Sequence, residues 1–407
     1  MQTNNSFFSV LWNKSAIYLS TLAGLFLSLL ITLIVSHDLS IFERSGYGIA
    51  TVTLMQILMV IQLGLPGAFN IIGSRFFRGE LKKDLYLLYL SRVSFFIGSL
   101  IIFSYISDKT GLLIFFAIAS GIFLIPAQWI LNALQKDVSL EIFALLRLIP
   151  VFFQLFALLT VRILDHIHLN SYLLCWIFGN IVNFLVLVII VRISPLTQSQ
   201  KATQYSFFDF KTLAIAGFIP HVSLQEILRF ELILVPIIKS PLYAASFFIV
   251  IGISNWTKSI CDSIAIVNFK SYRNDMNFSE KSLQIKKIHR QIIIVAFSGT
   301  LINVILFRFL LHFLPNVYHS IFWGVVPFTL GATFSAARRL YLDLLRIGGA
   351  ATSRSASKIE LYSFLPILIA TSMLFFNLSL NAWACIWSIA TFLGLLITIW
   401  RLTNYEN

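Results

Sequence analysis

One apolar segment of the sequence carries polar side chains that could bind a charged ligand. His221, Gln225, Glu226 and Arg229 follow a proline near the middle of this segment. At about 100° per residue, an α-helix would place these four on one face about 140° wide, with Glu231 on the opposite side, toward a neighbouring helix or the outer interface. Because ionisable groups are costly inside a bilayer, the polar face is expected to line a hydrated cavity. An ion pair between Glu226 and Arg229 that holds helices together is the alternative.

The next apolar segment repeats the pattern with Asn255, Lys258, Ser259 and Asp262. These side chains fall within an arc of about 100° on a helix. Lys258 and Asp262 are four residues apart, so they could instead neutralise one another. Together the two faces predict a hydrated and partly cationic cavity. In a low dielectric, Arg229 and Lys258 would attract an anionic group such as a diphosphate.

Polar residues are fewer in the first half of the chain. The corresponding segment there offers Gln56, Gln62 and the kink sequence GLPG at 64–67, and Gln62 is the candidate to line the cavity. The sequence contains no GxxxxGK[ST], HExxH or GxSxG motif, and its three cysteines lie apart in apolar segments. We therefore expect no catalytic residue, metal site, disulfide or resident cofactor.

Membrane-spanning helices must position these side chains, because the composition is not that of a soluble protein. Of 407 residues, 58% are hydrophobic and 12% are charged, and the mean hydropathy is +0.86. Soluble chains carry about 25% charged residues. A transmembrane helix needs about 20 apolar residues, and runs of that length recur along the chain. The sequence therefore predicts an all-α polytopic membrane protein.

Apolar runs bounded by charged or turn residues predict about twelve transmembrane helices. The predicted spans are 15–35, 47–73, 86–106, 111–133, 142–163, 170–192, 212–237, 242–267, 291–313, 319–341, 360–377 and 382–400. Basic residues gather in alternate loops, at 75–83, at 270–290 and from Arg338 to 358, while few, such as Arg44, lie in the opposite loops. By the positive-inside rule both termini are cytoplasmic, and Trp383 lies at the outer interface. The basic residues that set the membrane topology thus account for the formal net charge of +13. We therefore expect no nucleic-acid partner.

A polar stretch, SPLTQSQKATQYS, follows the sixth span and divides the predicted helices into two lobes. The predicted domains are an N-terminal lobe at 1–193, a cytoplasmic linker at 194–209 and a C-terminal lobe at 210–407. A weak internal repeat supports the division, since SGYGIATVTLMQI aligns with SPLYAASFFIVIG and pairs Tyr47 with Tyr243. Two repeats of six helices are a transporter plan.

Three features resemble the Wzx-type flippases of the polysaccharide-transporter family, in the MOP superfamily that also includes MATE multidrug exporters and lipid II flippases. The first is SGYGIA at 45–50, with LGLPGAF at 63–69 and basic residues after it. The second is WILNALQ at 129–135, followed by LLR at 145–147. The third is the plan of six plus six helices, which covers the whole chain.

The resemblance implies two bundles, MATE-like in fold, around a central cavity that opens alternately to the two sides of the bacterial inner membrane. It implies that an undecaprenyl-diphosphate-linked oligosaccharide, an O-antigen or capsule repeat unit, passes from the cytoplasmic to the periplasmic leaflet. Cationic cavity residues are expected, and Arg229 and Lys258 are the candidates. Expected partners are membrane lipids, the polysaccharide polymerase and the chain-length proteins. Coupling to H⁺ or Na⁺ through Glu226 or Asp262, or consumption of the flipped product, would supply the energy.

Two alternatives remain open. A MATE-like cation-coupled multidrug exporter would share the fold, but a cavity for organic cations should be dominated by carboxylates. A membrane-embedded polysaccharide polymerase or glycosyltransferase would need a sizeable outer loop, whereas the longest predicted outer loop is roughly ten residues, near 37–46. We therefore expect a transporter and not an enzyme.

Overall fold

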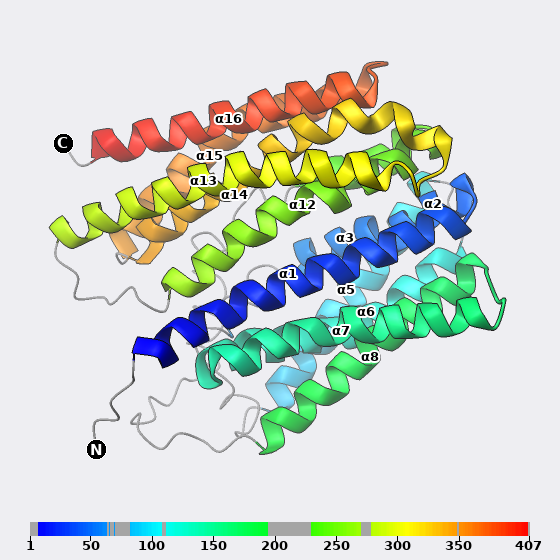
Figure 1. Ribbon diagram of the computed structural model, residues 1–407. Helices are drawn as coiled ribbons and strands as arrows, with labels where there is room; N and C mark the ends of the chain where they lie inside the picture. The colour runs from blue at the N-terminus through cyan, green and yellow to red at the C-terminus, as the bar shows by residue number, and fades with distance from the viewer. Residues whose placement is uncertain are drawn as a thin grey trace. The chain divides into compact units, whose positions relative to one another are not determined.

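The computed structural model describes residues 7–62, 65, 69, 82–107, 111–193, 229–269, 278–347 and 350–405. Every regular element among these residues is a helix, as predicted (Figure 1). Nine helices of the described chain are long and apolar enough to cross a membrane. The predicted fold class, an all-α multi-pass membrane protein, is therefore confirmed.

The chain divides into two compact units. The first contains residues 1–31 and 46–222, and the second contains residues 32–45 and 223–407. The tip of the first helical hairpin, residues 32–45, thus belongs to the second unit, which the sequence did not indicate. The predicted linker at 194–209 lies outside the described residues.

The first unit is built around helix α6. Its elements, in whole or in part, are α1 (Phe7–Asp38), α2 (Ile41–Gly48), the π-helical turn η1 (Ile49–Thr53), α3 (Leu54–Gln62), α5 (Lys82–Ser107), α6 (Gly111–Asp137), α7 (Leu140–Ile163) and α8 (Leu169–Ile193). Helix α6 contacts α3, α5, α7 and α8. Small buried residues along α6, Ala117, Ser120 and Gly121, allow the neighbouring helices to approach closely.

The second unit is built around helix α14. Its elements are α11 (Phe230–Ile238), α12 (Pro241–Phe269), α13 (Phe278–Leu310), η3 (Asn316–Ile321), α14 (Phe322–Ile347), α15 (Ala350–Ser372), η4 (Met373–Phe375) and α16 (Leu380–Tyr405). Helix α14 contacts α12, α13, α15 and α16. Where α12, α14 and α16 meet, the rings of Phe247, Phe328, Trp383 and Trp387 pack against one another.

Trp383, predicted at the outer interface, lies in the first turn of helix α16 with its side chain turned into the bundle. Its side chain is 0% exposed. The indole N–H donates to the carbonyl of Ala370 on α15 over 2.9 Å, so its polar atom is satisfied inside the bundle and needs no contact with the membrane surface.

The second span begins earlier than predicted, at Ile41 instead of residue 47. Ser40 and Glu43 form a capping box, in which the Glu43 carboxylate accepts from the Ser40 N–H at 3.1 Å. Arg44, predicted in an outer loop, is therefore helical and only 4% exposed, and its Nε donates to Ser36 Oγ at 3.1 Å. Burial raises the pKa of Tyr318 in η3, and the positive charge of Arg44 partly offsets that rise.

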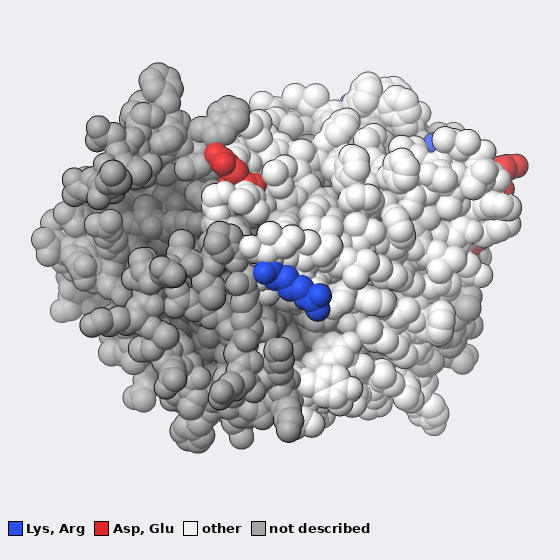
Figure 2. Space-filling model, turned by 90° about the horizontal axis from the view of Figure 1, so that it is seen from below, with Lys and Arg blue, Asp and Glu red and all other residues white. Residues whose placement is uncertain are grey.

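The described outer surface is mostly apolar. Large hydrophobic side chains such as Tyr105, Phe297 and Ile163 are among the most exposed residues of the described helices. Figure 2 shows a face on which charged side chains of the described residues appear at only a few places. Such a surface suits contact with lipid tails and accounts for the charge-poor composition.

Candidate functional site

The predicted cation Arg229 lies directly before helix α11, and its backbone is not helical, with φ −73° and ψ 62°. Its Nε donates to an Oε atom of Glu231 at 2.9 Å, and the two side chains are 15% and 3% exposed. The prediction that Glu231 points away from Arg229 is wrong, because it assumed one continuous helix through Arg229. The helix starts at Phe230 instead, which lets the two side chains meet.

The predicted topology would place this ion pair inside the membrane. Helix α11 has nine residues, and at about 1.5 Å per residue it spans about 13 Å, less than half of a hydrocarbon core of about 30 Å. With Ile238, at its other end, beside the predicted outer surface, Arg229 would lie near mid-membrane. Glu231 in the first turn also interacts favourably with the positive end of the α11 dipole.

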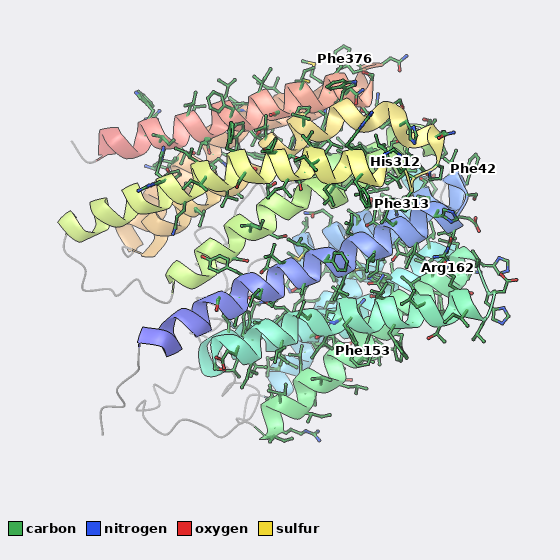
Figure 3. All side chains as sticks on the ribbon, viewed as in Figure 1. Phe42, Phe153, Arg162, His312, Phe313 and Phe376 are labelled. Atoms are coloured by element: carbon green, nitrogen blue, oxygen red, sulfur yellow. The ribbon has the colours of Figure 1, made fainter. Side chains whose placement is uncertain are left out.

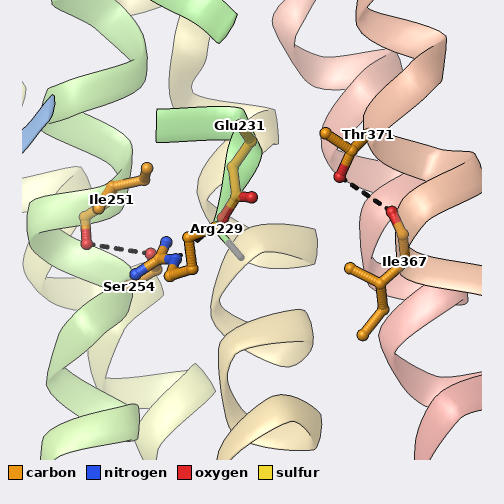
Figure 4. Close-up of polar contacts among 6 residues, drawn as sticks. All are labelled: Arg229, Glu231, Ile251, Ser254, Ile367 and Thr371. Carbon is orange, nitrogen blue, oxygen red and sulfur yellow. Dashed lines mark hydrogen bonds and ion pairs between the residues drawn. The ribbon is translucent and has the colours of Figure 1, made fainter. Parts of the chain in front are cut away.

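Helix α11 contacts helix α12, and Figure 4 draws Arg229 together with Ser254 of α12. The Ser254 hydroxyl donates to the carbonyl of Ile251 at 3.2 Å, and Ser254 is 2% exposed. Lys258 follows Ser254 by four residues, so it lies on the same face of α12, about 6 Å further along the axis. The two predicted cations thus lie on adjoining segments, Arg229 directly before α11 and Lys258 within α12.

Several predicted site residues cannot be placed in this seam. His221, Gln225 and Glu226 lie outside the described residues. Asn255 and Asp262 belong to helix α12, but their side chains lie outside the description. The pairings Glu226 with Arg229 and Lys258 with Asp262 thus stay predictions. No group of three His, Cys, Asp or Glu side chains suited to a metal ion occurs in the described part of the chain.

In the first unit, Gln62 joins a polar cluster that connects α3, α5 and α6. Its amide Nε2 donates to Gln128 Oε1 at 2.6 Å, and its Oε1 is buried without a hydrogen-bond partner. Arg92 on α5 donates from Nη1 to the carbonyl of Ile61 at 3.2 Å. That carbonyl belongs to the last turn of α3, just before the GLPG sequence, so Arg92 caps a helix end.

A second polar contact of the first unit joins residues far apart in sequence. Gln154 Nε2 on α7 donates to the hydroxyl of Tyr47 at 2.7 Å. The π-helical turn η1 follows Tyr47 directly, and Thr51 in that turn donates to the Tyr47 carbonyl at 2.8 Å. Gly179 on α8 makes room for this arrangement, because a Cβ there would lie 2.5 Å from the carbonyl oxygen of Pro150. π turns of this kind often mark functional positions.

The sequence missed a buried charged cluster in the second unit. Arg338, predicted among the loop residues, lies in α14 and is 0% exposed, as is Glu360 on α15. Arg338 Nη1 donates to Ser363 Oγ at 2.9 Å, and that hydroxyl donates to the Glu360 carbonyl at 3.0 Å. Arg338 was counted with the basic residues of a loop, although it also falls at the end of the predicted span 319–341. Helix α14 in fact continues to Ile347 and turns Arg338 inward.

Comparison by sequence identifies no relative, since no protein-family model and no curated protein matches the chain. Comparison by structure does. A multidrug resistance MATE family transporter of the MOP superfamily, in an inward-facing conformation, aligns with a TM-score of 0.67 at 8% identity, over 94% of each chain. The eukaryotic MATE transporter AtDTX14 aligns with a TM-score of 0.61 at 12% identity, over 98% of this chain and 96% of its own.

A third similar structure is a MOP superfamily transporter from Pyrococcus furiosus, for which a binding pocket of reverse polarity suggests a different function. It aligns with a TM-score of 0.56 at 9% identity, over 97% of this chain and 96% of its own. At such low identities these likenesses establish the fold. The chain has the MATE-like fold that its resemblance to the superfamily implied.

Proposed function

We propose that this protein is a flippase of the bacterial inner membrane that moves an undecaprenyl-diphosphate-linked oligosaccharide from the cytoplasmic to the periplasmic leaflet. The observation that supports this proposal is that Arg229 directly precedes α11 and Lys258 lies in α12, the helix that α11 contacts, so that two cations would lie inside the membrane on the predicted topology. A diphosphate is the part of such a substrate that two cations would recognise. The glycan would occupy the aqueous cavity, and the lipid tail would stay in the bilayer.

The ion pair with Glu231 orients Arg229 for this task. Glu231 engages Nε, and the two terminal Nη atoms have no protein partner among the described residues. These two nitrogens form the edge of the guanidinium that binds phosphate oxygens in a bidentate manner. The positive end of the α11 dipole adds to the attraction.

The positions of the acidic residues in the first lobe also favour a flippase. Every acidic residue of its described helices lies within the first or last three residues of a helix, as Asp38, Glu43, Asp84, Asp137 and Glu141 do. An exporter of organic cations would be expected to place carboxylates deeper in the membrane.

A MATE-like cation-coupled multidrug exporter is the second candidate, because two of the similar structures are MATE transporters. The ion pair of Arg229 with Glu231 disfavours the exporter, because a cavity for organic cations should be dominated by carboxylates. The Pyrococcus furiosus transporter indicates that this fold accommodates pockets of opposite polarity. A polymerase or glycosyltransferase would need a longer outer loop than the described ones. Residues 164–168 join α7 to α8, and η4 with residues 376–379 joins α15 to α16.

The energy source and the partners belong to the same proposal. Protons or Na⁺ would couple through Glu226 or Asp262, unless downstream consumption of the product draws the reaction forward. The product, an O-antigen or capsule repeat unit, would pass to the polysaccharide polymerase and chain-length proteins.

The test is translocation of undecaprenyl-diphosphate-linked oligosaccharide in inverted membrane vesicles. Wild type should translocate, and Arg229→Ala and Lys258→Ala should each reduce the rate at least tenfold, since a charge-assisted phosphate contact contributes about 1.5–3 kcal/mol. Matched controls are Arg192→Ala and Lys358→Ala, which remove exposed charges and should retain the rate. Export of a cationic dye without glycan translocation would establish the exporter instead.

A further inference from the structure

A pocket of ≈ 330 Å³ lies at the predicted outer end of the second unit, between the turn that joins α11 to α12 and the short helix η4. We propose that this pocket binds the phosphate of an anionic phospholipid of the outer leaflet. All of its lining residues belong to the second unit. The proposal does not depend on the flippase reading.

The pocket holds a cation without a carboxylate partner. Lys239 Nζ donates to the carbonyl of Phe376 at 2.7 Å and lies 5.4 Å from the ring centroid of Tyr243. Among the described residues, no acidic side chain forms an ion pair with it. An ammonium carries three N–H donors, and the carbonyl uses one of them. The remaining donors and the uncompensated charge suit a phosphate.

One residue that lines the pocket carries a buried hydroxyl that lacks a partner. Tyr243 lines the pocket, and its hydroxyl oxygen is buried and meets no hydrogen-bond partner in the described chain. A buried polar group left unsatisfied is costly, so a ligand that accepts a hydrogen bond there would be stabilised. At the position aligned by the internal repeat, the Tyr47 hydroxyl is satisfied by Gln154 at 2.7 Å. The second-lobe tyrosine lacks such a protein partner.

The position of the pocket favours a phosphate that is attached to a lipid. The apolar span of α15 ends at Phe375, so the pocket lies at the level where headgroups meet hydrocarbon. Phe375 and Phe376 line it and are 68% and 60% exposed. Figure 3 shows Phe376 at the turn between α15 and α16, at the end of the second unit farthest from the C-terminus. These rings would contact the glycerol and acyl regions of the lipid.

The test uses the purified full-length protein, delipidated in detergent and titrated with phosphatidylglycerol, with bound lipid counted by native mass spectrometry. Two variants remove the ligand contacts with little effect on folding. Lys239→Gln removes the charge but keeps a donor for the Phe376 carbonyl, and Tyr243→Phe removes a hydroxyl that has no protein partner. Matched controls are Lys358→Gln, at the opposite end of the unit, and Tyr105→Phe, on an exposed face.

We expect Lys239→Gln to weaken binding of the tightest lipid about tenfold and Tyr243→Phe about threefold to tenfold, with both controls unchanged. Affinities in both pocket variants equal to that of wild type would overturn the proposal. Inorganic phosphate and phosphatidylcholine serve as further probes. Displacement of phosphatidylglycerol by inorganic phosphate at equal concentration would identify a soluble ligand and overturn the lipid assignment. Equal binding of phosphatidylcholine, whose headgroup is neutral overall, would overturn the role of the Lys239 charge.

Discussion

The Nε atom of Arg229 lies 2.9 Å from a carboxylate oxygen of Glu231, only two residues further along the chain. Two residues apart on a continuous helix, these side chains would diverge by about 200°. They meet because helix α11 starts between them, at Phe230. The residue at which α11 starts therefore determines whether Arg229 is an isolated charge or is oriented and partly neutralised by Glu231.

Removal of one member of this pair should destabilise the protein more than removal of both. Arg229→Ala or Glu231→Ala leaves an uncompensated buried charge, which costs about 3 kcal/mol, whereas the double variant leaves none. Thermal unfolding of the purified protein in detergent, arranged as a double-mutant cycle, measures the coupling. If the destabilisations simply add, the two side chains act independently and the ion pair has no energetic role.

The contact of Tyr47 with Gln154 should couple α2 to α7. Tyr47→Phe and Gln154→Leu each remove one side of the 2.7 Å hydrogen bond, and we expect a coupling free energy of about 1 kcal/mol. The double-mutant cycle is again measured by thermal unfolding of the purified protein in detergent. Tyr105→Phe is the control, because Tyr105 is 91% exposed and its hydroxyl should contribute little. A coupling near zero would show that the bond does not contribute to the stability of the first unit.

Arg92 should stabilise the end of helix α3. Its Nη1 donates to the Ile61 carbonyl, so Arg92→Leu should lower the midpoint of thermal unfolding by several degrees. Arg92→Lys should retain part of the stability, since an ammonium also interacts favourably with a helix C-terminus. The control Arg192→Leu removes an exposed arginine at the end of α8. Equal midpoints for Arg92→Leu and Arg192→Leu would support the simpler role of a headgroup anchor.

Gly394 should be irreplaceable where Gly98 is not. A Cβ on Gly394 would lie 2.5 Å from the carbonyl oxygen of Ser363, whereas a Cβ on Gly98 would meet nothing within 4 Å. Gly394→Ala should force α16 away from α15 and disturb the Arg338 contact with Ser363. Gly98→Ala should leave stability unchanged or raise it by up to about 1 kcal/mol, because alanine favours the helix. Fluorescence-detected size-exclusion chromatography after heating compares the two variants, and equal losses would argue against the tight contact.

The sequence by itself determined the class of the protein and its all-helical architecture. Hydropathy is a local property, because every residue of a spanning helix contacts either lipid or another helix. Runs of about 20 apolar residues therefore indicate a spanning helix without knowledge of the tertiary structure. The capping box of Ser40 and Glu43 was equally local, and its S-x-x-E spacing could have placed the start of α2 at Ile41. Placing Arg229 and Lys258 on two consecutive segments also required only the positions of charged residues.

The tertiary structure alone decided which polar groups meet. The helical period indicates the face on which a side chain lies, but not where a helix starts, and that start pairs Arg229 with Glu231. It also does not indicate which neighbour covers a face, so the contact of Gln154 with Tyr47, 107 residues away, could not be inferred. Arg338 looked like a loop residue, yet continuation of α14 buries it beside Ser363. In a membrane, buried polar groups must find partners inside the protein, and only helix packing determines which ones they find.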